Sequence, residues 1–366
     1  MHGGSYPAQT MNNEKNTLKQ FYKIFDIPDF AYNWVDRFFE DEEIEMILLL
    51  AKKALSPGQI ADKLSAGKTK WPADSLQEFI DRCFKRGIIN RGTDGSYAPA
   101  DFHARFEVWA MFEGWQDIPE NIRQQLNAWE IDYYESRHAE QIRSLKQGTS
   151  RDPGQVCPEY LLLHEAESLI DRVGHVYLFP CNCRSMMKRC RQSVYTCLRF
   201  TNDRGLGWEI SKYRAKEIVR EANRNGLMQS GEVAVAQDGA IDGAICNCCP
   251  DCCYPHQLAE RQDARKLWPL TRYVARHIKD RCTVCGRCIR RCPFGAFGFE
   301  EKENARDGQR QQSADNEKKI RFNVDLCRGC GICSTGCPEQ AIEMVTLNSR
   351  QSIYSRILGI GRQPAI

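Results

Sequence analysis

The chain has 366 residues, of which 42% are hydrophobic and 27% charged, so it can bury sizeable cores and is neither a disordered tail nor a fibrous repeat. Its longest apolar run, Met46 to Ala51, is far shorter than the roughly 20 residues that cross a bilayer, so we expect no membrane span. The N-terminal residues lack the basic region, apolar core and cleavage site of a secretory signal. These observations predict a cytoplasmic protein of two or three domains.

Cysteine is unusually frequent and unevenly placed. The chain holds 19 cysteines, of which only Cys83 lies before Cys157. Many of the others are two or three residues apart, which is too close for a set of loop-closing disulfides. In a reducing compartment, thiols at such spacing are more often metal ligands or redox centres than disulfide cross-links.

Charge follows the same division. Residues 1–156 carry 19 Lys and Arg against 24 Asp and Glu, a net charge of −5, whereas the remainder carries 32 against 24, a net charge of +8. The cysteine-rich part is therefore basic. Lysine and arginine there would offset the negative charge of metal–thiolate centres.

Residues 30–99 predict three helices and a hairpin. The expected helices cover Glu42–Ala54, Gln59–Leu64 and Leu76–Arg86, and the strands flank the turn at Asp94 and Gly95. This order resembles a winged helix. Because DNA binding draws most of its affinity from basic side chains and this part is acidic, we expect a module for packing or protein docking, with nucleic-acid binding as the alternative.

An aromatic helical stretch follows, from His103 to Gln147. Its regularly spaced Phe, Trp and Tyr residues predict ordinary core. Cys83, which lies on the preceding helix, is also expected to be a small core residue. The polar segment from Gln147 to Gln155 contains Gly and Pro, which places a domain boundary there.

The middle of the chain predicts alternating helices and strands. The expected elements are a helix over Glu159–Asp171, a strand over Gly174–Phe179, a helix over Lys212–Asn225 that Ser211 caps and Gly226 ends, and a strand over Gly243–Ile245. Each strand leads directly into a Cys-x-Cys pair. If a β-α-β connection makes the strands neighbours, both thiol pairs meet at one edge of a small sheet.

Two copies of one cysteine motif lie near the C-terminus. The first copy is Cys282, Cys285, Cys288 and Cys292 with Pro293, and the second is Cys327, Cys330, Cys333 and Cys337 with Pro338. Both copies resemble the bacterial dicluster ferredoxins, in which the fourth cysteine of each run binds the cluster of the other run. The resemblance implies one [4Fe-4S] cluster held by Cys282, Cys285, Cys288 and Cys337, and a second held by Cys327, Cys330, Cys333 and Cys292.

The surroundings of the motifs fit this resemblance. Strands are expected over Ala296–Glu300, Ile320–Val324 and Ala341–Val345, and glycines within the motifs would let the backbone approach sulfide. An insert over Glu301–Lys319 is almost entirely polar and is expected to be a solvated loop. Zinc sites use CxxC pairs as well, but two quartets with a trailing proline favour iron–sulfur clusters.

Nine further cysteines in the middle region are candidate ligands of another site. They are Cys181, Cys183, Cys190, Cys197, Cys246, Cys248, Cys249, Cys252 and Cys253. With the ferredoxin part, this CxCR and CNCC layout resembles a family of multidomain iron–sulfur proteins found mainly in anaerobic bacteria. Four interpretations stay open: one extra [4Fe-4S] cluster with a redox-active thiol pair, two extra clusters, one unusual cluster with adjacent cysteine ligands, or zinc. The two members of an adjacent pair cannot both point at one small cluster.

These patterns predict an α+β protein in four parts. Residues 1–150 form a winged-helix-like and helical domain, 151–270 a small cysteine-rich α/β domain, 271–347 a ferredoxin domain with a β-α-β repeat, and 348–366 a C-terminal tail. We expect an electron-transfer protein with two [4Fe-4S] clusters, one or two additional clusters in the middle region, and a protein redox partner that is an oxidoreductase or a ferredoxin- or flavodoxin-like donor. The alternatives are a redox-responsive DNA-binding regulator and a reductase with its catalytic site in the middle region.

Overall fold

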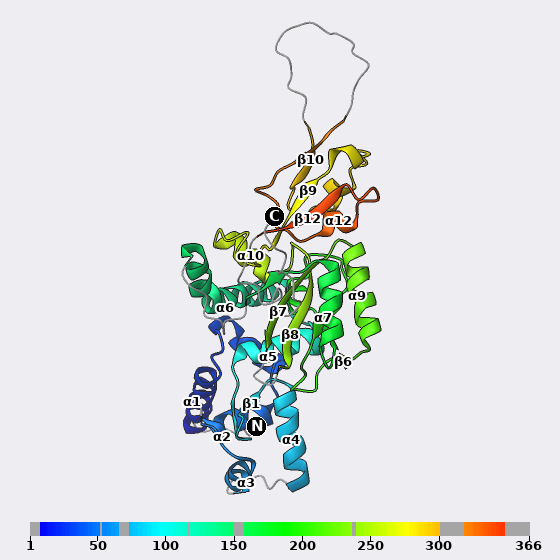
Figure 1. Cartoon of the computed structure of the whole chain (residues 1–366). Coiled ribbons are helices and arrows are strands. Elements are labelled where there is room, and N and C mark those ends of the chain that lie inside the picture. Colours follow the sequence, from blue (N-terminus) through cyan, green and yellow to red (C-terminus); the bar gives the residue numbers. More distant parts are fainter. Residues whose placement is uncertain are drawn as a thin grey trace. The chain divides into compact units, whose positions relative to one another are not determined.

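The computed structural model describes residues 8–51, 53–65, 73–115, 117–148, 157–235, 239–300 and 318–347 (Figure 1). Contacts divide the chain into two units. The first holds residues 1–133 with the short segments Ser185–Met187 and Asp203–Leu206, and the second holds the rest. The predicted boundaries of the four parts stay predictions, and the C-terminal tail lies outside the described residues. None of the described helices is long and apolar enough to cross a membrane.

The first unit is mainly helical. Its elements are α1 (Ala8–Ile24), the 3-10 helix η1 (Asp29–Arg37), α2 (Asp41–Leu50), α3 (Pro57–Ser65), α4 (Ala73–Lys85), β1 (Ile89–Arg91), β2 (Tyr97–Pro99), α5 (Phe102–Val108), the π-helical turn η2 (Trp109–Glu113) and the first half of α6 (Glu120–Gln147). Strands β1 and β2 pair antiparallel. Three helices and a hairpin therefore follow one another as predicted, while the winged-helix interpretation stays a prediction.

Aromatic side chains fill the core of this unit. Phe38 contacts Phe102, Phe106 and Trp109 with ring centroids 4.7–6.2 Å apart. The predicted aromatic core is thus present at Phe106 and Trp109, both of which are buried. Cys83 is fully buried, which confirms it as a core residue.

The second unit holds the cysteine-rich elements. The first of these are β3 (Glu159–Tyr160), α7 (Leu163–Arg172), β4 (Tyr177–Pro180), α8 (Asn182–Met187), β5 (Tyr195–Arg199), β6 (Trp208–Glu209), α9 (Lys212–Arg224), β7 (Met228–Val235), β8 (Ile241–Cys248) and α10 (Tyr254–Arg261). The later ones are β9 (Tyr273–His277), the 3-10 helix η3 (Lys279–Arg281), α11 (Arg287–Arg291), β10 (Phe297–Phe299), β11 (Ile320–Phe322), α12 (Ile332–Thr335) and β12 (Ile342–Thr346).

Six strands form one sheet in the order β3-β7-β8-β5-β4-β6, and all their pairs are antiparallel. The expected β-α-β connection between β4 and β8 is therefore wrong, because β5 lies between these two strands. Since each of them runs antiparallel to β5, they are parallel to each other. Their carboxyl ends consequently lie at the same edge of the sheet, so the expected meeting of the Cys-x-Cys pairs occurs for a different reason.

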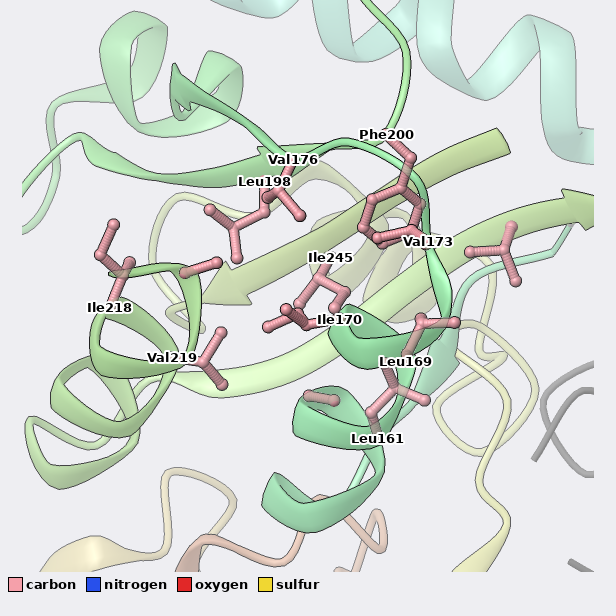
Figure 2. Packing of buried hydrophobic residues seen from close by; sticks show 13 residues of the cluster. Leu161, Leu169, Ile170, Val173, Val176, Leu198, Phe200, Ile218, Val219 and Ile245 are labelled. Carbon is pink, nitrogen blue, oxygen red and sulfur yellow. The ribbon is translucent and has the colours of Figure 1, made fainter. Parts of the chain in front are cut away.

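Helices α7 and α9 cover this sheet with an apolar core. Figure 2 shows Leu169 and Ile170 of α7 and Val219 of α9 packed toward Ile245 of the sheet. The side chain of Ser211 caps α9 as predicted, accepting a hydrogen bond from the Arg214 N–H at 3.2 Å. These contacts fix the sheet edge at which the thiols collect.

The predicted helix over Glu159–Asp171 is wrong at its start, because Glu159 and Tyr160 form strand β3. The Tyr160 N–H donates to the Leu270 carbonyl and the Leu161 N–H to the Gln229 carbonyl, which holds this segment extended. The helix begins at Leu163, where the Glu165 carboxylate accepts the preceding Leu162 N–H at 2.8 Å.

Two small antiparallel ladders frame the ferredoxin motifs. Strand β12 pairs with β9, and β10 pairs with β11. The strands expected on both sides of the motifs are present as β10, β11 and β12, whereas β9 was not predicted. Of the polar insert, residues 301–317 lie outside the described residues, and Lys318 and Lys319 are exposed.

Candidate iron-sulfur and thiol sites

The first ferredoxin-type quartet surrounds a cavity. Its lining includes the four thiol-bearing residues Cys282, Cys285, Cys288 and Cys337. Cys282 and Cys285 lie between η3 and α11, Cys288 lies in α11, and Cys337 comes from the other motif, just after α12. The tertiary structure thus brings together the four residues that the resemblance grouped.

The second quartet surrounds another cavity in the same way. Cys292, Cys327, Cys330 and Cys333 are among its lining residues. Here the first motif supplies the single cysteine and the second motif supplies three, so the two motifs exchange their fourth cysteine.

Backbone hydrogen bonds to sulfur repeat between the two halves. The Ala296 N–H donates to Cys292 Sγ at 3.3 Å, and the Ala341 N–H donates to Cys337 Sγ at 3.2 Å. Such bonds favour the thiolate and are one of the means by which a protein adjusts the potential of a cluster. Four thiols around each cavity, with this matching support, fit a [4Fe-4S] cluster on each side.

The two quartets differ in exposure. Cys285 of the first quartet is exposed, whereas Cys327, Cys330 and Cys333 of the second are each 8% exposed. Burial raises the pKa of Cys288 to about 11 and that of Cys330 to about 12. Because a ligand must be a thiolate, binding of a positively charged metal would have to overcome this penalty and would release protons.

Comparisons with known proteins agree with this geometry. A family model described as a 4Fe-4S dicluster domain matches residues 275–338, which include all eight ferredoxin-type cysteines. Pyruvate synthase subunit PorD of Methanothermobacter marburgensis is 36% identical over 66 residues, which are 18% of this chain and 58% of that protein. NADH-quinone oxidoreductase subunit I 2 of Aquifex aeolicus is 32% identical over 99 residues, which are 26% of this chain and 44% of that protein.

A third relative is a small ferredoxin. An uncharacterized ferredoxin of Methanocaldococcus jannaschii is 30% identical over 64 residues, which are 18% of this chain and 68% of that protein. Through this C-terminal segment the chain belongs to the 4Fe-4S dicluster ferredoxins. The chain spans only 58% and 44% of the first two relatives, and no solved structure matches it significantly.

The nine cysteines of the middle region fall into two groups. Cys190, Cys249 and Cys252 form the first, which we call the thiol trio, and their Sγ atoms all lie within 4.8 Å of one another. The other six interact with one another and form the second, which we call the thiol sextet: Cys181, Cys183, Cys197, Cys246, Cys248 and Cys253.

The adjacent pairs divide between these groups. Cys248 and Cys253 belong to the sextet, whereas their neighbours Cys249 and Cys252 belong to the trio. Within the sextet, hydrogen bonds join Cys248 to Cys246 and to Cys253 and lower the pKa of Cys248. The Ser230 hydroxyl lies 3.4 Å from the same sulfur. One thiol at the centre of a hydrogen-bonded set is suited to redox or metal chemistry.

A buried arginine lies between the two groups. Arg184 is 2% exposed and donates to the carbonyls of Ser193 and Asn247 at 2.6 and 2.9 Å, and to the hydroxyl of Thr196 at 2.8 Å. The thiols of Cys181 and Cys249 raise the pKa of its guanidinium, against the opposing effect of burial. Of the four basic residues in this segment, Lys188, Arg189 and Arg191 are exposed, and Arg184 is buried.

Buried aromatic residues connect the sextet with the second quartet. Tyr160 is fully buried and packs with Cys330, and its hydroxyl lies 3.0 Å from His256 Nε2. The His256 ring contacts Phe294, whose side chain lines the second cavity. Burial lowers the pKa of His256 to about 4, so the ring is neutral, and its Nδ1 is buried without a hydrogen-bond partner.

The sequence analysis identified neither Tyr160 nor Phe294 as part of a site. Phe294 directly follows the Cys292–Pro293 step. This position next to a ligand candidate was the local feature that could have indicated its place beside the second quartet. Tyr160 belonged to the segment that was expected to be helical, so no pattern in the sequence placed it beside a cysteine.

Proposed function

We propose that this chain is an electron-transfer protein that binds two [4Fe-4S] clusters and passes electrons between a protein redox partner and a further iron–sulfur cluster that the thiol sextet would hold. The eight ferredoxin-type cysteines would hold the clusters in the two crossed quartets. When bound, the clusters supply one-electron redox chemistry. The relatives named above are subunits of oxidoreductases and a ferredoxin, which supports this class of function.

The first quartet provides the partner-facing end. Cys285 is exposed, and the basic residues Lys279, Arg281, Arg287 and Arg290 around it are exposed as well. A positively charged face favours a partner with an acidic docking surface, because complementary charge speeds encounter. We therefore place the docking face for the redox partner here.

The second quartet provides the interior end, and one observation carries this proposal: Cys330, Tyr160, His256 and the sextet form a continuous buried contact. Cys330 packs with Tyr160, the Tyr160 hydroxyl meets His256, and the backbone N–H of His256 is bonded to Cys253 of the sextet. Phe294 lies beside this route and contacts His256. Packed, buried contacts are a suitable medium for electron transfer between two buried centres.

Two variants test the connection. We expect His256→Ala and Phe294→Ala to retain the iron content of the ferredoxin part and to slow reduction of the cluster held by the sextet by at least about tenfold, because each substitution opens a gap in the packing. The measurement is rapid-freeze EPR with thiol counting after anaerobic mixing with a strong low-potential reductant. Phe299→Ala is the matched control, since Phe299 is an exposed aromatic residue of the same ferredoxin part.

Two results would overturn the proposal. Full-rate reduction of the cluster held by the sextet in both variants, or the absence of any such cluster, would show that electrons do not use this connection. Anaerobic protein with clearly fewer than eight irons per chain would show that the two quartets do not both hold [4Fe-4S] clusters.

A further inference from the structure

The thiol trio has a spacing that the other cysteine groups lack. Cys249 Sγ lies 3.6 Å from Cys190 Sγ, and all three sulfurs are within 4.8 Å of one another. Cys190 follows α8 and the other two lie in the turn between β8 and α10, where both are buried. Three thiols from two distant segments therefore converge on one point.

This spacing distinguishes a single ion from a cluster. With zinc–sulfur bonds of about 2.3 Å in a tetrahedron, two sulfurs are about 3.8 Å apart. In a [4Fe-4S] cluster each thiolate binds a different iron, so the sulfurs lie further from one another. Among the described residues only the trio has three such groups this close, and no three thiols of either ferredoxin quartet meet the same limit.

The charge around the trio also fits a single divalent ion. Three thiolates and one divalent cation have a net charge of −1, and the Arg184 guanidinium beside Cys249 supplies the matching positive charge. The charged neighbours of Arg184 are thiols, Cys249 and Cys190 of the trio and Cys181 of the sextet, and its buried Nε has no hydrogen-bond partner. A buried arginine of this kind requires an anionic neighbour, and the metal–thiolate centre would be that neighbour.

We propose that Cys190, Cys249 and Cys252 bind one divalent cation of the zinc type, separately from the iron–sulfur centres and from the sextet. Three protein ligands leave a fourth position for water or a substrate atom, which is the arrangement of catalytic rather than structural zinc sites. This inference does not depend on the electron-transfer proposal, because it concerns thiols outside the two quartets.

Metal analysis of anaerobically purified protein tests the site. We expect about one zinc per chain in addition to iron, and we expect Cys190→Ser and Cys252→Ser to lose that zinc while keeping their iron. Cys157→Ser is the matched control, since Cys157 is a buried thiol of the same unit that belongs to neither quartet, nor to the trio or the sextet, and its Sγ donates to the Pro158 carbonyl at 3.4 Å. Cobalt(II) added to zinc-depleted protein should give thiolate-to-cobalt absorption in the wild type and the control but not in the trio variants.

A second measurement covers variants that fail to fold. Zinc-edge X-ray absorption of the wild type should show three sulfur neighbours at about 2.3 Å and one lighter atom. Three outcomes would each overturn the site. The trio variants could lose iron in place of zinc, the X-ray absorption could show metal–metal scattering, or the wild type could contain no metal other than iron and bind no cobalt. Iron and zinc contents are determined independently, so the zinc result can be interpreted even if the electron-transfer proposal fails.

Discussion

Gly329 shows at the scale of one residue how closely the second quartet is held to strand β9. Its φ is +69°, and a Cβ atom at this position would lie 2.1 Å from the Tyr273 carbonyl oxygen. The sequence pointed to these glycines as places where backbone approaches sulfide. The structure adds that Gly329 approaches the backbone of a neighbouring strand, which no side chain could allow.

We predict that Gly329→Ala destabilises the ferredoxin part by more than about 3 kcal/mol and empties the second quartet, because the strand must move. Gly295→Ala is the control. Gly295 also has a positive φ, +67°, but nothing lies within 4 Å of its Cβ position, so only about 1–2 kcal/mol of backbone strain is expected. Anaerobic thermal bleaching of the cluster absorbance compares them, and equal shifts for the two variants would contradict the role assigned to the Tyr273 contact.

His103 is a second residue whose surroundings decide its behaviour. Its Nδ1 lies 2.9 Å from Glu130 Oε1, and its ring stacks on Tyr133. Burial lowers the pKa of His103, but the hydrogen bond and charge of Glu130 outweigh burial, with smaller contributions from Glu107 and Asp101, so the net pKa is raised. The pKa of Glu130 is also raised, in this case because burial disfavours the charged carboxylate. The folded unit therefore holds its protons more tightly than the unfolded chain.

The stability that His103 contributes is consequently present below its unfolded pKa of about 6.5 and is lost as pH rises through the higher folded pKa. We predict that helix α5 exchanges its amide hydrogens faster at about pH 8 than at about pH 6, after correction for intrinsic exchange. In His103→Gln this difference should shrink. An unchanged pH dependence in the variant would assign the effect to another group.

At the scale of elements, Arg291 of α11 joins three helices. Its Nε donates to the Ile332 carbonyl of α12 at 2.9 Å, and its two terminal nitrogens donate to the Arg224 and Asn223 carbonyls of α9 at 2.9 and 2.8 Å. Carbonyls at a helix C-terminus lack intrahelical partners, and a guanidinium satisfies them well. The helices next to the quartets are thereby fixed to the helix that covers the large sheet.

We predict that Arg291→Met costs about 3 kcal/mol, since it leaves three carbonyls without their charged donor. Hydrogen exchange should accelerate at the C-terminal end of α9 and in α12. Arg290→Met is the matched control, because Arg290 is exposed and makes a single 3.4 Å contact with the Cys285 carbonyl; its effect should stay within about 0.5 kcal/mol. Equal protection in both variants would show that Arg291 does not couple the helices.

A buried polar network continues this connection toward the middle thiols. The Thr335 hydroxyl donates to Asn223, Asn223 donates to Gln229, and Gln229 donates to Asn247, with distances of 2.7–2.9 Å. The Asn247 carbonyl in turn accepts from Arg184. Satisfied networks of this kind specify one arrangement of their elements, so the ferredoxin part and the thiol groups of this unit are held in one geometry.

For the whole molecule, the docking face proposed around Cys285 is tested through its charge. We predict that Arg287→Gln raises the KM for an acidic protein redox partner roughly threefold at low ionic strength, because it weakens electrostatic steering toward exposed Cys285. The difference should vanish at high salt, where charges beyond a few ångströms are screened.

Arg214→Gln provides the control for this measurement. Arg214 is an exposed arginine of α9 that pairs with Glu217 on the same helix, away from the ferredoxin motifs in sequence. Equal salt-dependent effects of the two variants would indicate a general charge effect and not a docking face around Cys285.

The sequence by itself determined the ferredoxin-type motifs and most of their flanking strands. The repeated spacing with its trailing proline is a local signal, and the resemblance to dicluster ferredoxins implied how the eight thiols group around two clusters. The helices α4 and α9 were equally predictable, because apolar periodicity and capping residues such as Ser211 are local signals.

Only the tertiary structure decided how the nine middle thiols divide. Cys190 and Cys249 are separated by 58 intervening residues yet lie 3.6 Å apart at the sulfurs, and Cys248 and Cys249 are neighbours that face different groups. Antiparallel pairing through β5 and the burial of Arg184 set this division. Contacts between strands distant in sequence depend on the packing of the entire sheet, and no spacing along the chain encodes them.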